Sequence, residues 1–275
     1  MPVKPARKAV LAEADALIDA FYPSTKQAVD GLYAAWSGNA KVRSAINALN
    51  VGESSPGEFI QQVIEAFQSV NPRTAQVFAK NGITAGELFQ NVYGLNAPLN
   101  AELWADQFAG QRIASLREAS IDAVRDYVSR SLETGTPLNN LARDIEGVVK
   151  LDKRFTTATV NRHKALIARS GARSGTQRNV SAYINRSAKV KSEQIARTEL
   201  AIAQNHGRYQ SLYAARAAGL LDDTDLMVWI AAPDCCDLYS TYNGMTASID
   251  DGFGTSTGAV FPPLHPNCRC TFGIK

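Results

Sequence analysis

The stretch Phe261-Pro262-Pro263-Leu264-His265-Pro266-Asn267-Cys268-Arg269-Cys270 ends five residues before the last residue of the chain. Three of its side chains, His265, Cys268 and Cys270, are ligands that zinc prefers, and they fall within six residues. The three prolines fix φ at their positions and leave the backbone few conformations. We therefore expect a defined local structure here, and not an ordinary surface loop.

All four cysteines of the chain lie in its last 41 residues, because Cys235 and Cys236 precede this stretch. One or two of these cysteines, together with His265, Cys268 and Cys270, have the ligand number and type of a tetrahedral zinc site. The alternative is a set of reduced or disulfide-paired cysteines in a small terminal lobe. Cys-x-Cys is tighter than the usual ligand spacing, so the residue types leave both interpretations open.

Length and composition permit a substantial core. The chain has 275 residues, of which 45% are hydrophobic, enough for one large domain or two ordinary ones. No apolar segment of a signal peptide is present near the N-terminus, and no run approaches the ~20 apolar residues of a membrane span. We expect synthesis and residence in a reducing cytoplasm, where thiols are favoured over disulfides.

The net charge of +3 conceals an uneven distribution. The stretch from Lys150 to Arg197 carries twelve Lys or Arg and two acids, so its charge is +10 and that of the remainder is −7. This asymmetry predicts an acidic partner, either nucleic acid or an acidic protein surface, with Arg169, Arg173 and Arg178 as contact residues. The alternative is a set of solvated helix faces.

The first 100 residues contain several helix signals. Ser55-Pro56-Gly57-Glu58 is a capping box with proline at the first helical position, and it predicts a helix that ends at Asn71-Pro72. Thr84-Ala85-Gly86-Glu87 repeats the pattern and predicts another helix start. An earlier apolar periodicity predicts a helix that ends before Pro23. Residues 1–100 are expected to form a region of short helices.

Later patterns are longer. Apolar periodicity predicts a helix over 100–134 and another that starts at Thr136-Pro137. A basic, Gly/Ser-rich connection follows at 170–176, and then a helix over 192–218. Leu226 to Ala231 is the only convincing strand. The predicted fold is mainly α-helical, with a small C-terminal α+β lobe that carries short strands and a Cys/His cluster.

The helix over 192–218 places polar and small residues on neighbouring sides. Ala196, Ala203 and Gly207 would let another backbone approach closely. Polar groups in a packed face must find hydrogen-bond partners. Clusters of buried polar side chains stabilise a fold more often than they form an active site. The predicted structural polar cluster comprises Arg197, Thr198, Glu199, Asn205 and His206.

Several separate motifs appear in a familiar order. They are Ile195-Ala196-Arg197-Thr198-Glu199-Leu200, Asn205-x-Gly207, a strand with Trp229, an Asp-Cys segment, Asn243-Gly244, Phe261-Pro262-Pro263 and His265-Pro266-Asn267-Cys268-Arg269-Cys270. In this order they resemble the phage head morphogenesis family, the minor head proteins named after the F protein of phage Mu. The resemblance covers about residues 120–275.

The resemblance implies a structural virion protein that joins the capsid during assembly and associates with the portal vertex, with portal protein and major capsid protein as partners. It implies residues 101–275 as the family domain, and a structural zinc held by Cys236, His265, Cys268 and Cys270, with Cys235 as an additional candidate. The family usually has Cys-x-x-Cys before the Asn-Gly or Asp-Gly turn. Here Cys236 matches the first cysteine and Tyr239 occupies the second. The Cys/His lobe is expected over 226–275.

Two enzyme classes are weighed against this structural role. A zinc hydrolase or deaminase is one, but deaminase chemistry needs a glutamate beside the histidine and a Pro-Cys-x-x-Cys motif, and neither occurs. An ADP-ribosyltransferase is the other, because Arg197-Thr198-Glu199 faintly resembles an Arg/Ser/Glu set. The sequence favours a structural protein with no catalytic residues.

Overall fold

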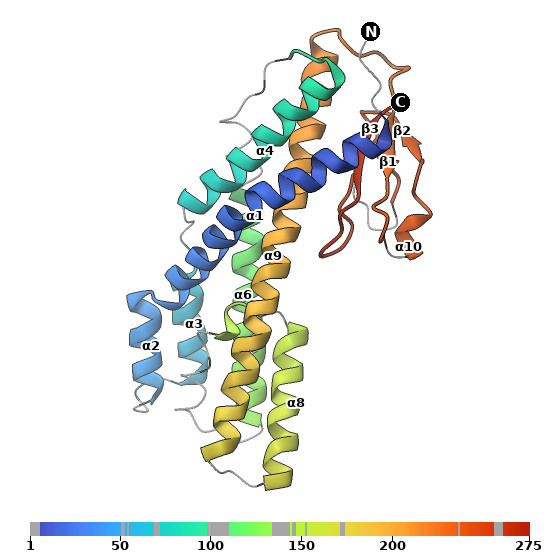
Figure 1. Cartoon of the computed structure of the whole chain (residues 1–275). Coiled ribbons are helices and arrows are strands. Elements are labelled where there is room, and N and C mark those ends of the chain that lie inside the picture. Colours follow the sequence, from blue (N-terminus) through green and yellow to red (C-terminus); the bar gives the residue numbers. More distant parts are fainter. Residues whose placement is uncertain are drawn as a thin grey trace. The chain divides into compact units, whose positions relative to one another are not determined.

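The computed structural model describes residues 6–50, 53, 55–68, 72–97, 99, 110–133, 144, 147–151, 153–170, 174–235, 237–255 and 261–275. Helices make up about 70% of the chain, and a sheet of three short strands lies near its C-terminus (Figure 1). The mainly helical fold with a small strand-bearing lobe is thus confirmed, whereas a Cys/His cluster is not seen among the residues just given. None of the described helices is long and apolar enough to cross a membrane.

The helices are α1 (Arg7–Ser37), α2 (Ala40–Asn50), α3 (Pro56–Ala66), α4 (Pro72–Tyr93), α6 (Gly110–Glu133), α8 (Lys153–Ser170), α9 (Ser174–Ala217) and the single turn α10 (Asp237–Ser240). The strands are β1 (Met227–Ile230), β2 (Thr246–Ala247) and β3 (Thr271–Ile274). The described residues form two compact units, each assembled from segments far apart in the sequence.

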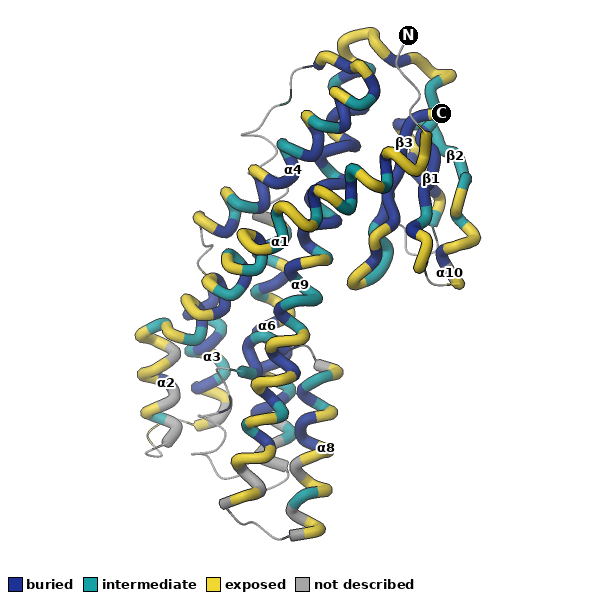
Figure 2. Tube along the Cα trace, in the orientation of Figure 1, coloured by how far each residue is buried: buried dark blue, intermediate teal, exposed yellow. Residues whose placement is uncertain are grey.

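The first unit contains residues 1–27, 75–109 and 194–275. Its sheet has the antiparallel order β2-β1-β3, with Trp229 opposite Phe272. All four residues of β1 are buried, as the dark blue tube shows (Figure 2). The predicted strand at 226–231 is confirmed as β1, while β2 and β3 are additional. Around the sheet, Phe89, Leu212 and Phe253 help to form one apolar core.

A close crossing joins α4 to α9 within this unit. Gly207 lies so near α4 that an added Cβ would stand 1.9 Å from the carbonyl oxygen of Gly82. Ser211 on the next turn donates its hydroxyl to the carbonyl of Gly86 at 2.9 Å. The small residues of α9 thus admit another backbone, as the sequence pattern predicts.

The second unit contains residues 28–74 and 110–193. Trp36 and Phe67 pack with ring centroids 5.4 Å apart. Buried Asp144 accepts hydrogen bonds from Tyr127 at 2.9 Å and from Ser181 at 2.8 Å. These contacts tie α6 and the first part of α9 to the segment that precedes α8.

The capping box at Ser55 is confirmed in full. The Ser55 hydroxyl accepts from the Glu58 amide at 3.2 Å, and the Glu58 carboxylate accepts from the Ser55 amide at 2.7 Å. The helix it opens ends at Ala66, and Pro72 begins α4. The signals predicted at 100–109, 134–137 and 171–173 lie outside the described residues.

Three other predicted boundaries are wrong. The helix predicted over 192–218 is the last part of α9, which already begins at Ser174. Pro23 lies inside α1, which continues to Ser37. The lost backbone hydrogen bond is offset because residues beyond Pro23, such as Leu32 and Trp36, are almost completely buried. Thr84-Ala85-Gly86-Glu87 lies inside α4, where Gly86 serves the close crossing with α9 and not a helix start.

The crossing predicts the effect of a single methyl group. Gly207→Ala should lower the free energy of unfolding by about 1–3 kcal/mol, because the backbone of α4 would have to move. Gly31→Ala is the matched control, since Gly31 also lies inside a helix but faces open space, and it should raise stability by about 0.5–1 kcal/mol. Denaturant unfolding followed by circular dichroism measures both. Equal stability of Gly207→Ala and the wild-type chain would contradict the crossing.

Candidate functional site

A charged side chain lies in the core of the first unit, between α1, α9 and β3. Arg208 on α9 has no exposed surface. Its guanidinium donates to the carboxylate of Glu13 on α1 at 3.1 Å and to the hydroxyl of Thr271 on β3. Burial lowers the pKa of Arg208 and the charge of Glu13 opposes that shift, so the guanidinium is charged and paired.

The same side of α9 holds the last strand through an amide. Asn205 donates to the carbonyl of Cys270 at 3.3 Å and accepts from the hydroxyl of Thr271 at 2.8 Å. Tyr93 on α4 adds a third contact, because its hydroxyl accepts from the Ile274 amide at 3.1 Å. We call the contacts of Glu13, Asn205, Arg208 and Thr271 the polar seam. It fixes β3 on α9 through side chains as well as through apolar packing.

The cysteines lie next to the polar seam, because Cys270 precedes Thr271 and its carbonyl accepts from Asn205. Cys268 and Cys270 are both buried, and the sulfur of partly exposed Cys235 lies 3.3 Å from that of Cys270. A hydrogen bond with Cys270, followed by burial, raises the pKa of the Cys268 thiol, while the same bond lowers that of Cys270. The structure thus brings together Cys235, Cys268 and Cys270.

His265 makes different contacts. Its ring stacks on that of Tyr239 at 5.0 Å between centroids, and its Nδ1 lies 2.8 Å from the carbonyl oxygen of Pro266. Cys236 lies outside the described residues. Among the residues that are described, no group of three or more His, Cys, Asp or Glu side chains is arranged to hold a metal ion. These residues alone therefore do not make a zinc site.

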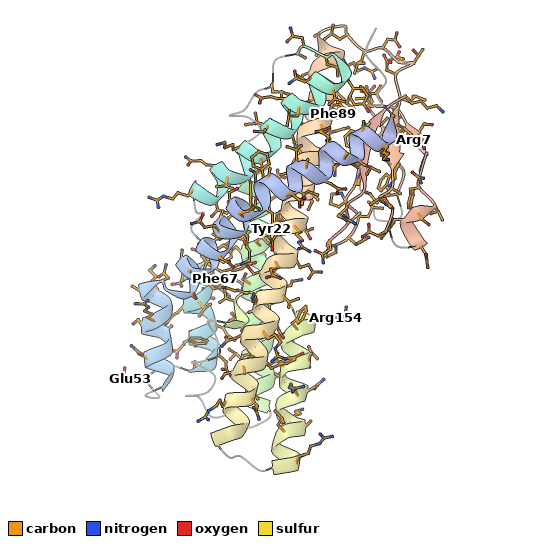
Figure 3. All side chains as sticks on the ribbon, in the orientation of Figure 1. Arg7, Tyr22, Glu53, Phe67, Phe89 and Arg154 are labelled. Carbon is orange, nitrogen blue, oxygen red and sulfur yellow. The ribbon has the colours of Figure 1, made fainter. Side chains whose placement is uncertain are left out.

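An open pocket of about 610 Å³ adjoins the cysteines. It is lined by Asp15, Ile18, Asp19, Tyr22, Arg197, Asp234, Asn267, Cys268 and Arg269. Arg269 pairs with Asp234 at 2.5 Å, and the guanidinium of Arg197 lies 5.3 Å from the ring centroid of Tyr22, which is labelled on α1 in Figure 3. Cys268 is the only thiol in this lining, and its raised pKa makes it a poor nucleophile.

The five members of the predicted polar cluster have separate environments. Arg197 is exposed, whereas Glu199 is buried. Thr198 accepts from the Asn267 amide at 3.1 Å and so holds the turn before Cys268. Asn205 belongs to the polar seam, and His206 packs edge-on against Phe261, where burial lowers its pKa to about 4. Only Arg197 of the Arg197-Thr198-Glu199 set lines the pocket.

The basic stretch forms much of α8 and the first part of α9. Arg169 and Arg178 are exposed near the connection between these helices, and Arg173 lies outside the described residues. The two aromatic rings within the stretch are occupied by its own cations. Arg162 lies over Tyr183 at 4.9 Å and Lys191 over Phe155 at 5.8 Å.

Sequence reasoning missed Arg208 and its partners. Arg208 shares one side of α9 with Ala201, Leu212 and Ala215, all of them buried, so a lone charge on an apolar stripe was the available signal. Nothing local pointed to Glu13, which is 195 residues away.

The polar seam predicts a large stability effect. Arg208→Met should lower the free energy of unfolding by about 3–5 kcal/mol, because it leaves the carboxylate of Glu13 without its cation in a buried setting. Arg269→Met is the control, since Arg269 also pairs with a carboxylate, that of Asp234, but is partly exposed. This variant should cost about 0–1 kcal/mol of stability. Thermal and denaturant unfolding distinguish the two. Similar losses for both variants would refute a special role of the buried pair.

Comparison with known proteins adds the family. No curated protein and no solved structure matches the chain significantly. A family model described as Phage Mu protein F like protein matches residues 122–273, which is more than half of the chain and includes α8, α9, the sheet and the cysteines. The resemblance carried by the motifs from Ile195 to Cys270 is thereby confirmed. The chain belongs to the phage Mu F-like family of head morphogenesis proteins.

Proposed function

We propose that the protein is a minor structural component of a tailed-phage head, and that it acts during capsid assembly at or near the portal vertex. The family match over residues 122–273 carries this proposal. Within that range the polar groups form structural contacts, while many basic residues remain exposed on α8 and α9. Such a molecule acts through its surfaces.

The basic surface near the α8–α9 connection is the proposed contact with portal or capsid protein. Arg169 and Arg178 are exposed there, so they are available to acidic groups. Packaged DNA is the second candidate partner. Proteins that bind single strands stack bases on free aromatic rings, but Phe155 and Tyr183 are covered by Lys191 and Arg162. A DNA contact would therefore rest on phosphate charge alone.

The comparisons do not support the enzyme alternatives. A hydrolase or transferase needs an activated nucleophile or a positioned acid–base pair in its cavity. The described lining of the pocket offers Cys268, whose thiol pKa is raised, and aspartates of which Asp234 is already paired with Arg269. A structural role accounts for the pocket without chemistry.

Charge reversal tests the docking proposal. Arg169→Glu, Arg173→Glu and Arg178→Glu in one chain should remove the protein from assembled particles, as mass spectrometry of purified heads would show. Lys8→Glu, Lys41→Glu and Lys80→Glu in another chain change the net charge equally at exposed positions elsewhere, and should leave incorporation intact.

Duplex DNA binding by the free protein separates the two partners. If DNA is the partner, log affinity falls steeply with log salt concentration and the triple variant no longer binds DNA. If portal or capsid protein is the partner, DNA binding by the unmodified protein is weak from the start. Particles that retain the triple variant at normal copy number would rule out docking through this surface.

We also propose that one structural zinc is bound when Cys236 contributes, with Cys268, Cys270 and either His265 or Cys235 completing the set. The protein purified without chelator should contain about one equivalent of zinc, and Cys268→Ser should abolish it and lower the thermal stability of the C-terminal lobe. Elemental analysis and a melting curve test both effects. Metal-free protein with an unchanged melting temperature after chelator treatment would eliminate the zinc.

A further inference from the structure

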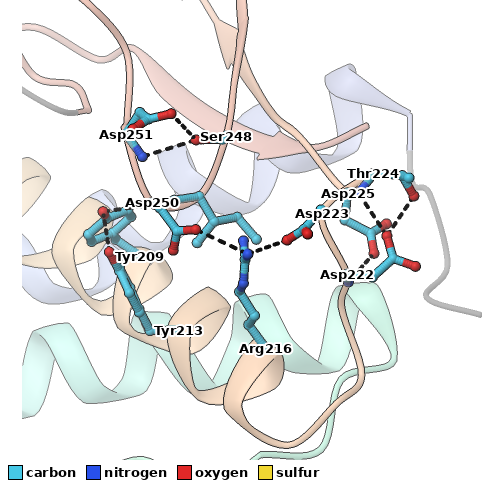
Figure 4. Close-up of polar contacts among 11 residues, drawn as sticks. Tyr209, Tyr213, Arg216, Asp222, Asp223, Thr224, Asp225, Ser248, Asp250 and Asp251 are labelled. Atoms are coloured by element: carbon cyan, nitrogen blue, oxygen red, sulfur yellow. Dashed lines mark hydrogen bonds and ion pairs between the residues drawn. The ribbon is translucent and has the colours of Figure 1, made fainter.

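The surface at the end of α9 is strongly acidic. From Ala217 to Cys268 the chain has seven aspartates and not one Lys or Arg. Figure 4 shows five of these aspartates, Asp222, Asp223, Asp225, Asp250 and Asp251, and among them Arg216 pairs with Asp223 and, at 3.0 Å, with Asp250. The hydroxyl and amide of Thr224 lower the pKa of Asp222, so its carboxylate stays charged. One arginine therefore faces an excess of negative charge.

This acidic surface also exposes large apolar side chains. Tyr213 is 39% exposed and Leu220 is 42% exposed, and both flank Arg216 in the sequence. The ring of Tyr213 packs edge-on against Tyr209, whose hydroxyl is held by the Ile249 carbonyl at 3.0 Å, so Tyr213 is presented from a fixed support. We call Tyr213, Leu220 and the surrounding aspartates the acidic patch.

The opposite character occurs on the second unit. Arg186 and Lys189 are exposed on one face of α9, and Val190 beside them is 53% exposed. We call these three residues the basic patch. It lies farther along α9 than Arg178, which together with Arg169 on α8 carries the proposed docking surface. Within the described part of the chain, Val190, Tyr213 and Leu220 are the large hydrophobic side chains that stand exposed.

Each patch therefore combines an apolar centre with charge of one sign, and the two signs are opposite. Specific interfaces have this composition, with an apolar core that includes aromatic residues and a charged rim that selects the partner. DNA does not suit the acidic patch, because its phosphates would be repelled. A surface with complementary charge and its own apolar centre is present on every other copy of the same chain.

We propose that the acidic patch of one copy docks on the basic patch of a second copy. The two patches differ, so the contact is heterologous, and repetition of it closes a ring or continues as a row of copies. Val190 meets Tyr213 and Leu220 at the centre, while Arg186 and Lys189 meet the aspartates at the rim. This self-association is independent of the proposed contact with the portal.

Light scattering of the nuclease-treated, purified protein tests the proposal. The mass should exceed that of one chain and rise with protein concentration at low salt. It should return to that of one chain when NaCl is raised from about 0.05 M to about 0.5 M, because screening weakens the rim. Val190→Ser with Leu220→Ser should weaken association without a change in charge. A single-chain mass under every condition would overturn the proposal.

A charge exchange makes the test specific. Arg186→Glu with Lys189→Glu gives a chain with two negative patches. Asp223→Lys with Asp251→Lys gives a chain whose acidic patch has lost its net negative charge. Arg216 keeps Asp250 in the second variant. Each variant alone should stay monomeric, whereas an equal mixture should associate, because the unmodified acidic patch of the first variant then meets the unmodified basic patch of the second.

Circular dichroism of both variants should first establish that they are folded. Should the aspartate variant unfold, the Arg186/Lys189 variant and the Val190/Leu220 variant still decide the question. Association that survives charge reversal of Arg186 and Lys189 would refute the interface, and association that disappears on nuclease treatment would assign the basic patch to nucleic acid.

Discussion

The buried guanidinium of Arg208 is the constraint on which the first unit depends. A charge without water around it costs several kcal/mol unless it is paired and hydrogen-bonded, so Arg208 tolerates no arrangement in which Glu13 and Thr271 are absent. Glu13 lies near the start of the chain and Thr271 near its end. The pairing therefore joins α1, α9 and β3 in one cooperative structure. Because β1 pairs with β3, the same contacts also position β1.

Local signals predicted the elements well where local physics decides them. The capping box at Ser55 is complete within four residues, and the β1 sequence is apolar throughout because both of its faces are buried. The helix end predicted at Pro23 and the helix start predicted at Thr84 are wrong because contacts distant in sequence decide these positions. Tertiary packing carries α1 past a proline, and Gly86 resembles part of a helix start although its purpose is contact with Gly207.

The candidate site divides in the same way. Cys268 and Cys270 were recognisable because they are neighbours in sequence, and the small residues of α9 correctly predicted a close backbone approach. The polar seam joins residues separated by up to 195 positions, and no periodicity within a single helix specifies such a partner. The stacking of His265 on Tyr239 is equally non-local, and it concerns the position where the sequence departs from the family's Cys-x-x-Cys pattern.

The nearly neutral total charge hides a contrast between paired polar groups in the interior and charged surfaces outside. Several of its buried polar groups pair with one another: Arg208 with Glu13, Asn205 with Thr271, and Cys268 with Cys270. Groups committed in this way are poor candidates for acid–base or nucleophilic work, because each would have to give up a partner in a low-dielectric setting. The exposed charge is positive on α8 and the first part of α9 and negative after Arg216. A molecule whose surfaces carry charge of opposite sign in different places is suited to assembly with other proteins, which agrees with its place in a head morphogenesis family.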